Sequence, residues 1–85
     1  DWLDLDATIV CVIEGNDDFE GTMGSFELDY KGTRFRAGSG PTHQERAEYW
    51  KLRDKMPGLT VKIKYEMLSD TGVPLKPVII FTELP

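Results

Sequence analysis

Residues 20–40 read EGTMGSFELDYKGTRFRAGSG, and this stretch decides the fold. Outward polar and inward apolar residues alternate over Ser25–Tyr30 and again over Thr33–Ala37, which is the period of a β-strand with one buried face. Lys31-Gly32 lies between these two runs and can close a tight hairpin. Glycines gather at both ends of the stretch, where they indicate tight backbone geometry or the close approach of a ligand. We therefore predict a small β-barrel built around this hairpin.

Three further strands and one helix are predicted outside the hairpin. The strands are runs rich in apolar and β-branched residues: Ala7–Glu14, Leu59–Tyr65 and Lys76–Thr82. Thr42-His43-Gln44-Glu45 fits a capping box at the start of a helix that runs to about Lys55, before Pro57-Gly58. We expect Ala47, Trp50 and Tyr49 to face the barrel, and Arg46 to face solvent or a ligand.

The order of the predicted elements is strand, strand, strand, helix, strand, strand. A helix between the third and fourth strands of a five-stranded Greek-key barrel is the arrangement of the OB-fold. The predicted fold class is therefore all-β with a small helical content. Residues 1–6 are acidic and are expected to be a linker from an upstream domain, and residues 7–85 are expected to be the OB-fold domain.

The length and the cysteine content of the chain limit the number of domains and disulfides. A chain of 85 residues holds one domain. The single cysteine, Cys11, excludes an intramolecular disulfide, and its apolar neighbours predict a buried thiol in a reducing compartment. No signal peptide is recognised, and the apolar runs are too short to cross a bilayer. We expect an intracellular protein with no membrane partner.

The charge of the chain is unevenly distributed along the sequence. The formal net charge is -5, yet residues 31–64 contain nine Lys and Arg against three acids, while residues 1–30 contain nine acids and no Lys or Arg. A basic segment inside an acidic protein predicts a local surface that faces an anion. The overall acidity argues against a strong free-standing nucleic-acid binder, but not against one face of a larger nucleic-acid enzyme.

The candidate anion-binding side chains lie mainly on the hairpin. Period-two alternation places Arg34 and Arg36 on the outer face of their strand, close to Lys31 in the turn. Guanidinium groups form paired hydrogen bonds with phosphate oxygens and can position a duplex without reading its sequence. The alternative is a solvated strand face on which these residues pair with Glu27 and Asp29. The residues alone leave both interpretations open.

Further candidates lie outside the hairpin. The backbone N–H groups of Gly38-Ser39-Gly40 can donate to a phosphate, although this segment can also be a simple connection to the helix. Lys62 and Lys64 are expected on an outer strand face, within reach of a nucleic-acid backbone. His43 has no second histidine or cysteine near it in the sequence, so we predict no metal site.

Three motifs in this order resemble the OB-fold domain of ATP-dependent DNA ligases. The first is Phe19-Glu20-Gly21-Thr22-Met23-Gly24-Ser25, and the second is Phe35-Arg36-Ala37-Gly38-Ser39-Gly40 followed by a helix with Glu45-Arg46. The third is Gly72-Val73-Pro74-Leu75-Lys76-Pro77-Val78 before an apolar strand. The resemblance covers nearly the whole chain, from about Ala7 to Phe81.

The resemblance implies a role in nick sealing during DNA replication or repair. In this family the OB domain follows a nucleotidyltransferase domain, whose lysine is adenylated with ATP and Mg²⁺ before AMP passes to the 5′-phosphate at a nick. The OB domain helps to clamp the nicked duplex through backbone contacts. The implied DNA-binding residues in this chain are Lys31, Arg34, Arg36, Gly38, Ser39, Gly40, Lys62 and Lys64.

Two family motifs are not found at their usual places. Lys-x-Asp-Gly, which holds the catalytic lysine, does not occur, so the resemblance implies a fragment that is not catalytic alone and binds no cofactor itself. Arg-x-Asp-Lys, which orients the ATP phosphates, does not follow the last strand, where the chain reads Phe81-Thr82-Glu83-Leu84-Pro85. Arg53-Asp54-Lys55 resembles part of it but precedes the fourth strand. A role in adenylation stays open.

Other functions remain as alternatives. One is the OB domain of an RNA ligase or capping enzyme, and another is a free-standing single-strand binder, which should expose aromatic residues on the second and third strands. A third alternative is a protein-interaction module without a nucleic-acid role, which the acidic first 30 residues favour.

Overall fold

The hairpin expected from the sequence forms one side of the barrel. The computed structural model describes residues 2–85. Strands β2 (Met23–Tyr30) and β3 (Thr33–Ala37) pair antiparallel, with Phe26 opposite Ala37. Lys31 and Gly32 both have positive φ angles, 50° and 89°, as a two-residue turn between twisted strands requires.

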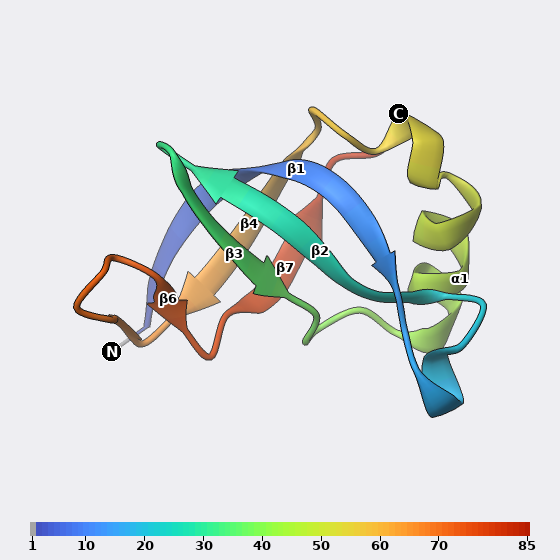
Figure 1. Cartoon of the computed structure of the whole chain (residues 1–85), viewed down its shortest axis with the longest axis horizontal. Coiled ribbons are helices and arrows are strands. Elements are labelled where there is room, and N and C mark those ends of the chain that lie inside the picture. Colours follow the sequence, from blue (N-terminus) through green and yellow to red (C-terminus); the bar gives the residue numbers. More distant parts are fainter. Residues whose placement is uncertain (1) are drawn as a thin grey trace.

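Five strands close into a barrel around this hairpin (Figure 1). β1 (Leu3–Glu14) is long and bent, so that its first half pairs with β4 (Thr60–Tyr65) and its second half with β2. β7 (Val78–Thr82) pairs with β4, and a parallel bridge from Val78 to Ser39 joins β7 to the end of β3. The order β3-β2-β1-β4-β7 with this closing bridge confirms the predicted OB-fold.

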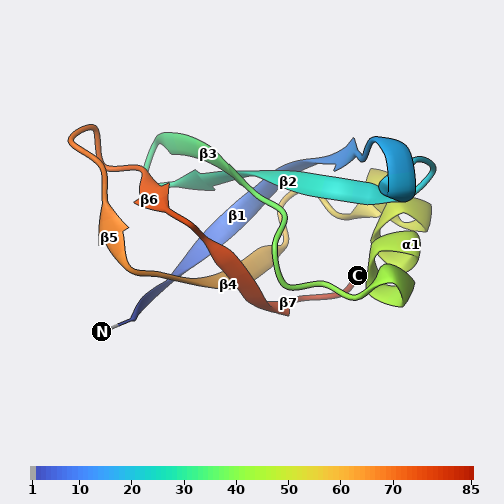
Figure 2. The same cartoon turned by 90° about the horizontal axis from the view of Figure 1, so that it is seen from below.

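One helix covers the end of the barrel where β1 ends and β2 begins (Figure 2). α1 (His43–Lys51) is followed by a 3₁₀ turn, η2 (Arg53–Lys55). The predicted capping box is confirmed: the Glu45 N–H donates to Thr42 Oγ1 at 3.1 Å, and the Thr42 N–H donates to Glu45 Oε1 at 2.8 Å. The capping box thereby satisfies two of the N–H groups at the start of the helix that have no partner within it.

Removing this cap is expected to cost moderate stability. A Thr42→Ala variant loses the side-chain acceptor for the Glu45 N–H, and such a change lowers the free energy of unfolding by about 1 kcal/mol. Urea denaturation monitored by circular dichroism measures this loss. A Thr42→Ser variant keeps the hydroxyl and serves as the control, which we expect to unfold at nearly the wild-type midpoint.

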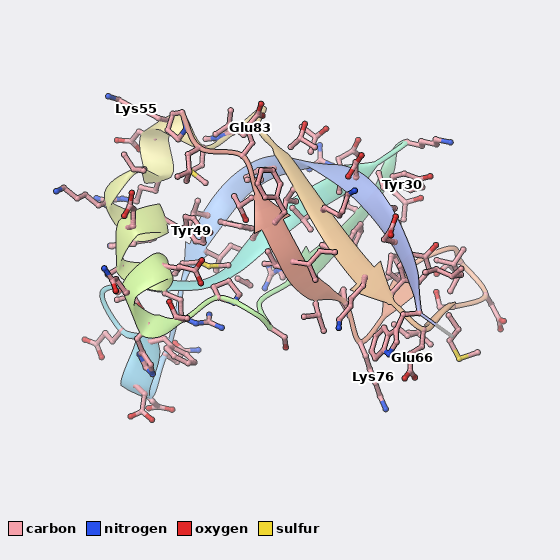
Figure 3. All side chains as sticks on the ribbon, turned by 180° about the vertical axis from the view of Figure 1, so that it is seen from behind. Tyr30, Tyr49, Lys55, Glu66, Lys76 and Glu83 are labelled. Atoms are coloured by element: carbon pink, nitrogen blue, oxygen red, sulfur yellow. The ribbon has the colours of Figure 1, made fainter. Side chains whose placement is uncertain are left out.

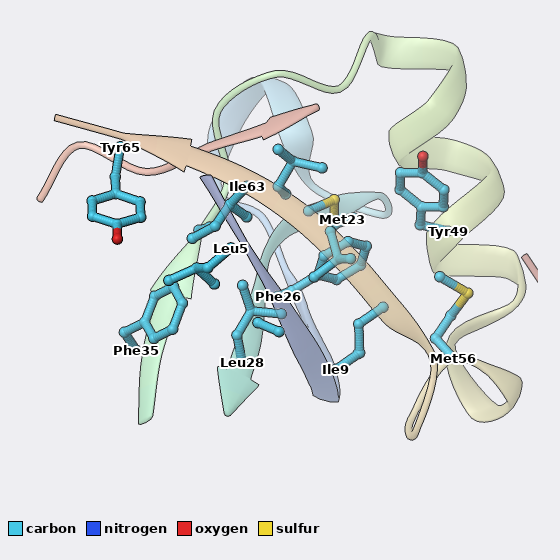
Figure 4. Packing of buried hydrophobic residues seen from close by; sticks show 14 residues of the cluster. Leu5, Ile9, Met23, Phe26, Leu28, Phe35, Tyr49, Met56, Ile63 and Tyr65 are labelled. Atoms are coloured by element: carbon cyan, nitrogen blue, oxygen red, sulfur yellow. The ribbon is translucent and has the colours of Figure 1, made fainter. Parts of the chain in front are cut away.

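The core fills the barrel with side chains from every main element (Figure 4). Phe26 and Leu28 from β2 are fully buried, as are Val61 and Ile63 from β4. Phe26 and Leu28, together with Phe35 of β3, are residues that the alternating pattern of the hairpin placed inward. The Tyr49 ring of α1 packs on Phe26 with 5.4 Å between the ring centroids, so the helix and the barrel share one core.

A short hairpin that was not predicted and a 3₁₀ turn lie outside the main strands of the barrel. Strands β5 (Met67–Leu68) and β6 (Pro74–Leu75) form a short hairpin around residues 69–72. A 3₁₀ turn, η1 (Asp17–Phe19), lies between β1 and β2. The short hairpin extends away from the end of the barrel that carries α1 (Figure 2).

The structure corrects the predicted start of the first strand. β1 begins at Leu3 rather than Ala7, because residues 3–6 pair with β4. Asp1 lies outside the described residues, and the connection of residues 1–6 to an upstream domain stays a prediction.

The predicted burial of Cys11 is also wrong. A register shift between Ile9 and Cys11 turns the thiol side chain to the outer face, where it is exposed. The extra residue of such a bulge reverses the alternation beyond it.

The predicted inner face of the helix is partly wrong. Ala47 is exposed and Trp50 is half-buried, whereas Arg46 and Tyr49 are the buried residues of α1. The helix sequence has no clear apolar stripe, so the tertiary contacts select its inner face.

Within residues 2–85, no helix has both the length and the apolar composition that a membrane span needs.

Candidate nucleic-acid interface

The outer face of the β2–β3 hairpin carries a ladder of alternating charges. Arg34 lies directly opposite Asp29, and Arg36 lies directly opposite Glu27. Arg34 contacts both acids, with 3.2 Å from Nη1 to Glu27 Oε2 and 3.3 Å from Nε to Asp29 Oδ1. Arg36 Nε is 3.9 Å from Glu27 Oε1. The cross-strand pairing that the sequence left as an alternative is therefore present.

The ladder still leaves both guanidinium groups accessible. The side chains of Arg34 and Arg36 are 57% and 67% exposed. Ion pairs exposed to this degree contribute about 0–1 kcal/mol, because water screens them. A phosphate can consequently replace a carboxylate as the partner of either arginine at little cost.

Lys31 extends the cationic face at the turn. It occupies the first turn position, where its φ is 50°, and its Nζ lies 5.2 Å from the centroid of the Tyr30 ring. This contact holds the ammonium group beside the end of β2, next to the strand of the two arginines.

The Gly38–Gly40 segment is packed against other backbone on two sides. A Cβ atom at Gly38 would lie 2.4 Å from the Gly24 carbonyl oxygen, and one at Gly40 would lie 2.2 Å from the Ile79 carbonyl oxygen. The Ile79 N–H donates to the Ser39 carbonyl at 2.8 Å. These two glycines thus have a structural reason, the closure of the barrel. Ser39 is exposed and continues the outer surface beyond Arg36.

The lysines of β4 lie apart from the arginines of β3. In the closed barrel, β4 is separated from β3 by β1 and β2 on one side and by β7 on the other. Lys62 is opposite Asp6, and Lys64 is opposite Asp4 with its Nζ 5.0 Å from the Trp2 ring centroid. Lys31, Arg34, Arg36 and the Gly38–Gly40 segment therefore follow one another along the turn, β3 and its end, whereas Lys62 and Lys64 lie on β4, which does not pair with β3.

Arg46 is a residue that the sequence reasoning missed. It is only 7% exposed, and its guanidinium donates to the carbonyl oxygens of Met23, Gly24 and Gly38. The helical spacing could have indicated its burial, because Arg46 lies three residues before Tyr49 and therefore on the same face of α1. That face packs on the barrel.

The remaining candidates have ordinary surroundings. The His43 ring packs against Phe19 with 5.0 Å between centroids. Over residues 2–85, no group of three or more His, Cys, Asp or Glu side chains could hold a metal ion. Arg53 of the partial Arg-x-Asp-Lys match stacks on the Trp50 ring at 4.4 Å and donates to the Trp50 carbonyl at 2.8 Å.

Comparisons with a family model and with solved structures both find DNA ligases. The family model described as DNA ligase OB-like domain matches residues 14–81. A structure of Chlorella virus DNA ligase-adenylate is similar at 30% sequence identity and TM-score 0.85, covering 99% of this chain. A second structure of that ligase-adenylate has 29% identity and TM-score 0.79 over 96% of this chain. No curated protein sequence matches.

A further similarity concerns the fold alone. A structure from a study of DNA binding by Lig E DNA ligases with a minimal scaffold has TM-score 0.85 at 23% identity, over 98% of this chain. The chain spans about a third of the length of these proteins, covering 31% of the Lig E ligase and 31% and 30% of the two virus ligase structures.

Proposed function

The chain belongs to the DNA ligase OB-like domain family, and from this membership we propose that it is the DNA-clamping OB domain of an ATP-dependent DNA ligase. The match of the family model to residues 14–81 carries the proposal. The similarity of nearly the whole chain to Chlorella virus DNA ligase-adenylate supports it.

In this proposal the domain holds nicked duplex DNA through the phosphodiester backbone. Lys31, Arg34 and Arg36 contact phosphate oxygens, and the Gly38–Gly40 segment packs against the same strand. Lys62 and Lys64 make further backbone contacts from β4. Contacts of this kind fix the position of a duplex without reading its sequence, as the sealing of nicks at any sequence requires.

The chemistry belongs to the rest of the enzyme. We propose that an upstream nucleotidyltransferase domain supplies the lysine that is adenylated with ATP and Mg²⁺, and that this domain brings the nick to it. The enzyme would act inside the cell, in DNA replication or repair.

A titration of nicked duplex DNA tests the clamp. The observable is fluorescence anisotropy at low and moderate salt, with the wild-type chain and an Arg34→Ala/Arg36→Ala variant. Each phosphate contact contributes about -0.9 to the slope of log K against log salt. We expect the variant to bind at least about tenfold more weakly and to lose about 1 to 2 from the magnitude of the slope.

A matched control separates local contact from net charge. The Lys51→Ala/Lys55→Ala variant loses the same two positive charges at the end of α1 and in η2, and Lys55 lies far from Tyr30 and the hairpin turn (Figure 3). We expect this control to retain most of the wild-type affinity. Equal losses in the two double variants would contradict the proposed binding face.

Removing the acids of the charge ladder should strengthen DNA binding, the opposite of removing the arginines. Glu27 and Asp29 lie beside the proposed phosphate contacts and repel DNA. Two unit charges at roughly 6 Å in a water-like dielectric interact by about 0.7 kcal/mol, so removing each acid should tighten binding about threefold. We expect a Glu27→Gln/Asp29→Asn variant to bind nicked DNA about tenfold more tightly at low salt. Unchanged affinity would place the DNA elsewhere.

A protein-interaction module is the second candidate. Three apolar side chains at the C-terminal end of the chain are exposed, namely Ile80 at 48%, Phe81 at 64% and Leu84 at 53%. Such a module would show no duplex binding at any salt, alone or joined to its neighbouring domain. The single-strand binder is less well supported, because Phe26 and Phe35 of the hairpin are buried in the core rather than exposed for stacking.

A further inference from the structure

Arg46 connects three separate segments from inside the protein. Its Nη1 donates to the carbonyl oxygens of Met23 at 3.2 Å and Gly24 at 3.1 Å, both at the start of β2. Its Nη2 donates to the Gly38 carbonyl, at the end of β3. The Phe19 ring of η1 lies 4.3 Å from the guanidinium carbon.

The guanidinium is held by carbonyl groups rather than by a carboxylate. None of the ion pairs within residues 2–85 includes Arg46, although the side chain is only 7% exposed. Burying a charge without an ionic partner is unfavourable compared with burying an apolar side chain. Stability alone therefore does not explain an arginine here. An arginine is explained by the geometry of its guanidinium, whose planar set of N–H donors reaches carbonyls at the start of β2 and the end of β3 at the same time.

These bonds fix one end of the Gly38–Gly40 segment. The Gly38 peptide is held between Arg46 and the Gly24 carbonyl, which a Cβ at Gly38 would approach to 2.4 Å. The other end is held by the hydrogen bond from the Ile79 N–H to the Ser39 carbonyl. The segment is thus pinned at both ends, two residues beyond Arg36.

We propose that Arg46 is a positioning residue for DNA binding: it holds the Gly38–Gly40 segment in the orientation in which that segment meets the phosphodiester backbone. This inference rests on the proposed function. Arg46 itself does not touch the DNA. Arg46 orders the segment before binding. The conformational entropy of ordering it is therefore not lost when the duplex binds, a loss that would weaken the affinity.

An Arg46→Lys variant tests this role at constant charge. A single ammonium group cannot reach the carbonyls of both Met23 and Gly38 in the way that the guanidinium does. We expect the folded variant to bind nicked duplex about tenfold more weakly, with an unchanged slope of log K against log salt, because no Lys or Arg contact with a phosphate is lost. An Arg34→Ala variant should lower both the affinity and the slope.

The control is Arg53→Lys. Arg53 also stacks on an aromatic ring and donates to a carbonyl, but it is exposed and its partners are both in Trp50. This variant should bind DNA as the wild type does. Wild-type affinity in a folded Arg46→Lys variant would overturn the positioning role, and so would a reduced salt slope, which indicates a lost phosphate contact.

A measurement on the unmodified chain covers the case in which the variant does not fold. Backbone ¹⁵N relaxation without DNA should give order parameters of about 0.85 for Ser39 and Gly40, the value of rigid backbone. Values below about 0.6 would show an unordered segment and would overturn the inference. If the wild-type chain binds no nicked duplex, alone or within the full-length enzyme, the proposed function fails and this role fails with it.

Discussion

Replacing Phe26 by alanine is expected to lower the free energy of unfolding by about 3 to 5 kcal/mol. The ring is fully buried between the barrel and α1, in contact with Tyr49. The substitution removes the transfer free energy of the ring and leaves a cavity that the closed barrel cannot collapse to fill. A domain of this length has a total stability of about 4 to 13 kcal/mol, so the variant should lose a large share of its stability.

Chemical denaturation measures the effect of this substitution. The denaturant midpoint should fall while the m-value stays unchanged. The matched control is Phe81→Ala, because Phe81 is 64% exposed on the same barrel and its loss should change stability by about 0.5 kcal/mol or less. A Phe26→Ala variant as stable as the Phe81→Ala variant would show that the barrel interior is not packed as described.

Substituting Gly40 by alanine should have the second-largest effect, a loss of about 3 kcal/mol or more. Two causes act together. The φ angle of 117° is one that residues with a side chain rarely adopt, and the new Cβ would lie 2.2 Å from the Ile79 carbonyl oxygen. Because that oxygen belongs to backbone, the strand must move and the bridge between Ser39 and Val78 is expected to break.

The thermal unfolding midpoint reports this loss. A change of 3 kcal/mol corresponds to about 12 to 24 °C in a domain of this size. Gly58→Ala is the control, since Gly58 has a φ of 92° but nothing within 4 Å of an added Cβ. This control should lower the free energy of unfolding by only about 1 to 2 kcal/mol, the cost of holding alanine in a left-handed conformation. Equal losses in the two variants would show that the close approach at Ile79 contributes nothing.

The Gly40 prediction gives the glycines of the proposed interface a structural role. The sequence left two interpretations of Gly38-Ser39-Gly40, a close approach of phosphate to the backbone or a simple connection to the helix. In the structure the close approach is made by the protein's own carbonyls, those of Gly24 and Ile79. The same packing presents Ser39 on the outer surface next to β3, so barrel closure and the proposed DNA contact depend on one segment.

For the charge ladder, the alternation of polar and apolar residues predicts the face of each side chain but not its binding partner. Period two placed Arg34 and Arg36 outward and Glu27 and Asp29 on the same face, and the structure agrees. Alternation could not choose between ion pairing and phosphate binding. The geometry shows that the ion pairs exist and that the arginines stay exposed. The proposed DNA binding would therefore replace carboxylate partners with phosphates.

The sequence by itself determined the strands of the hairpin and their faces, the turn at Lys31-Gly32, the capping box at Thr42 and the order of elements that defines the OB-fold. Each of these depends on residues within a few positions of one another, where side-chain period, turn conformation and local hydrogen bonds act directly.

Only the tertiary structure decided the exposure of Cys11, the burial of Arg46 and the bridge from Ser39 to Val78. A bulge in β1 reverses the side of Cys11, and the helix face is selected by carbonyls 22 and 23 residues earlier in the chain, those of Gly24 and Met23. Contacts between residues so far apart in the sequence leave no local pattern, because the energy that selects them arises only when the barrel closes.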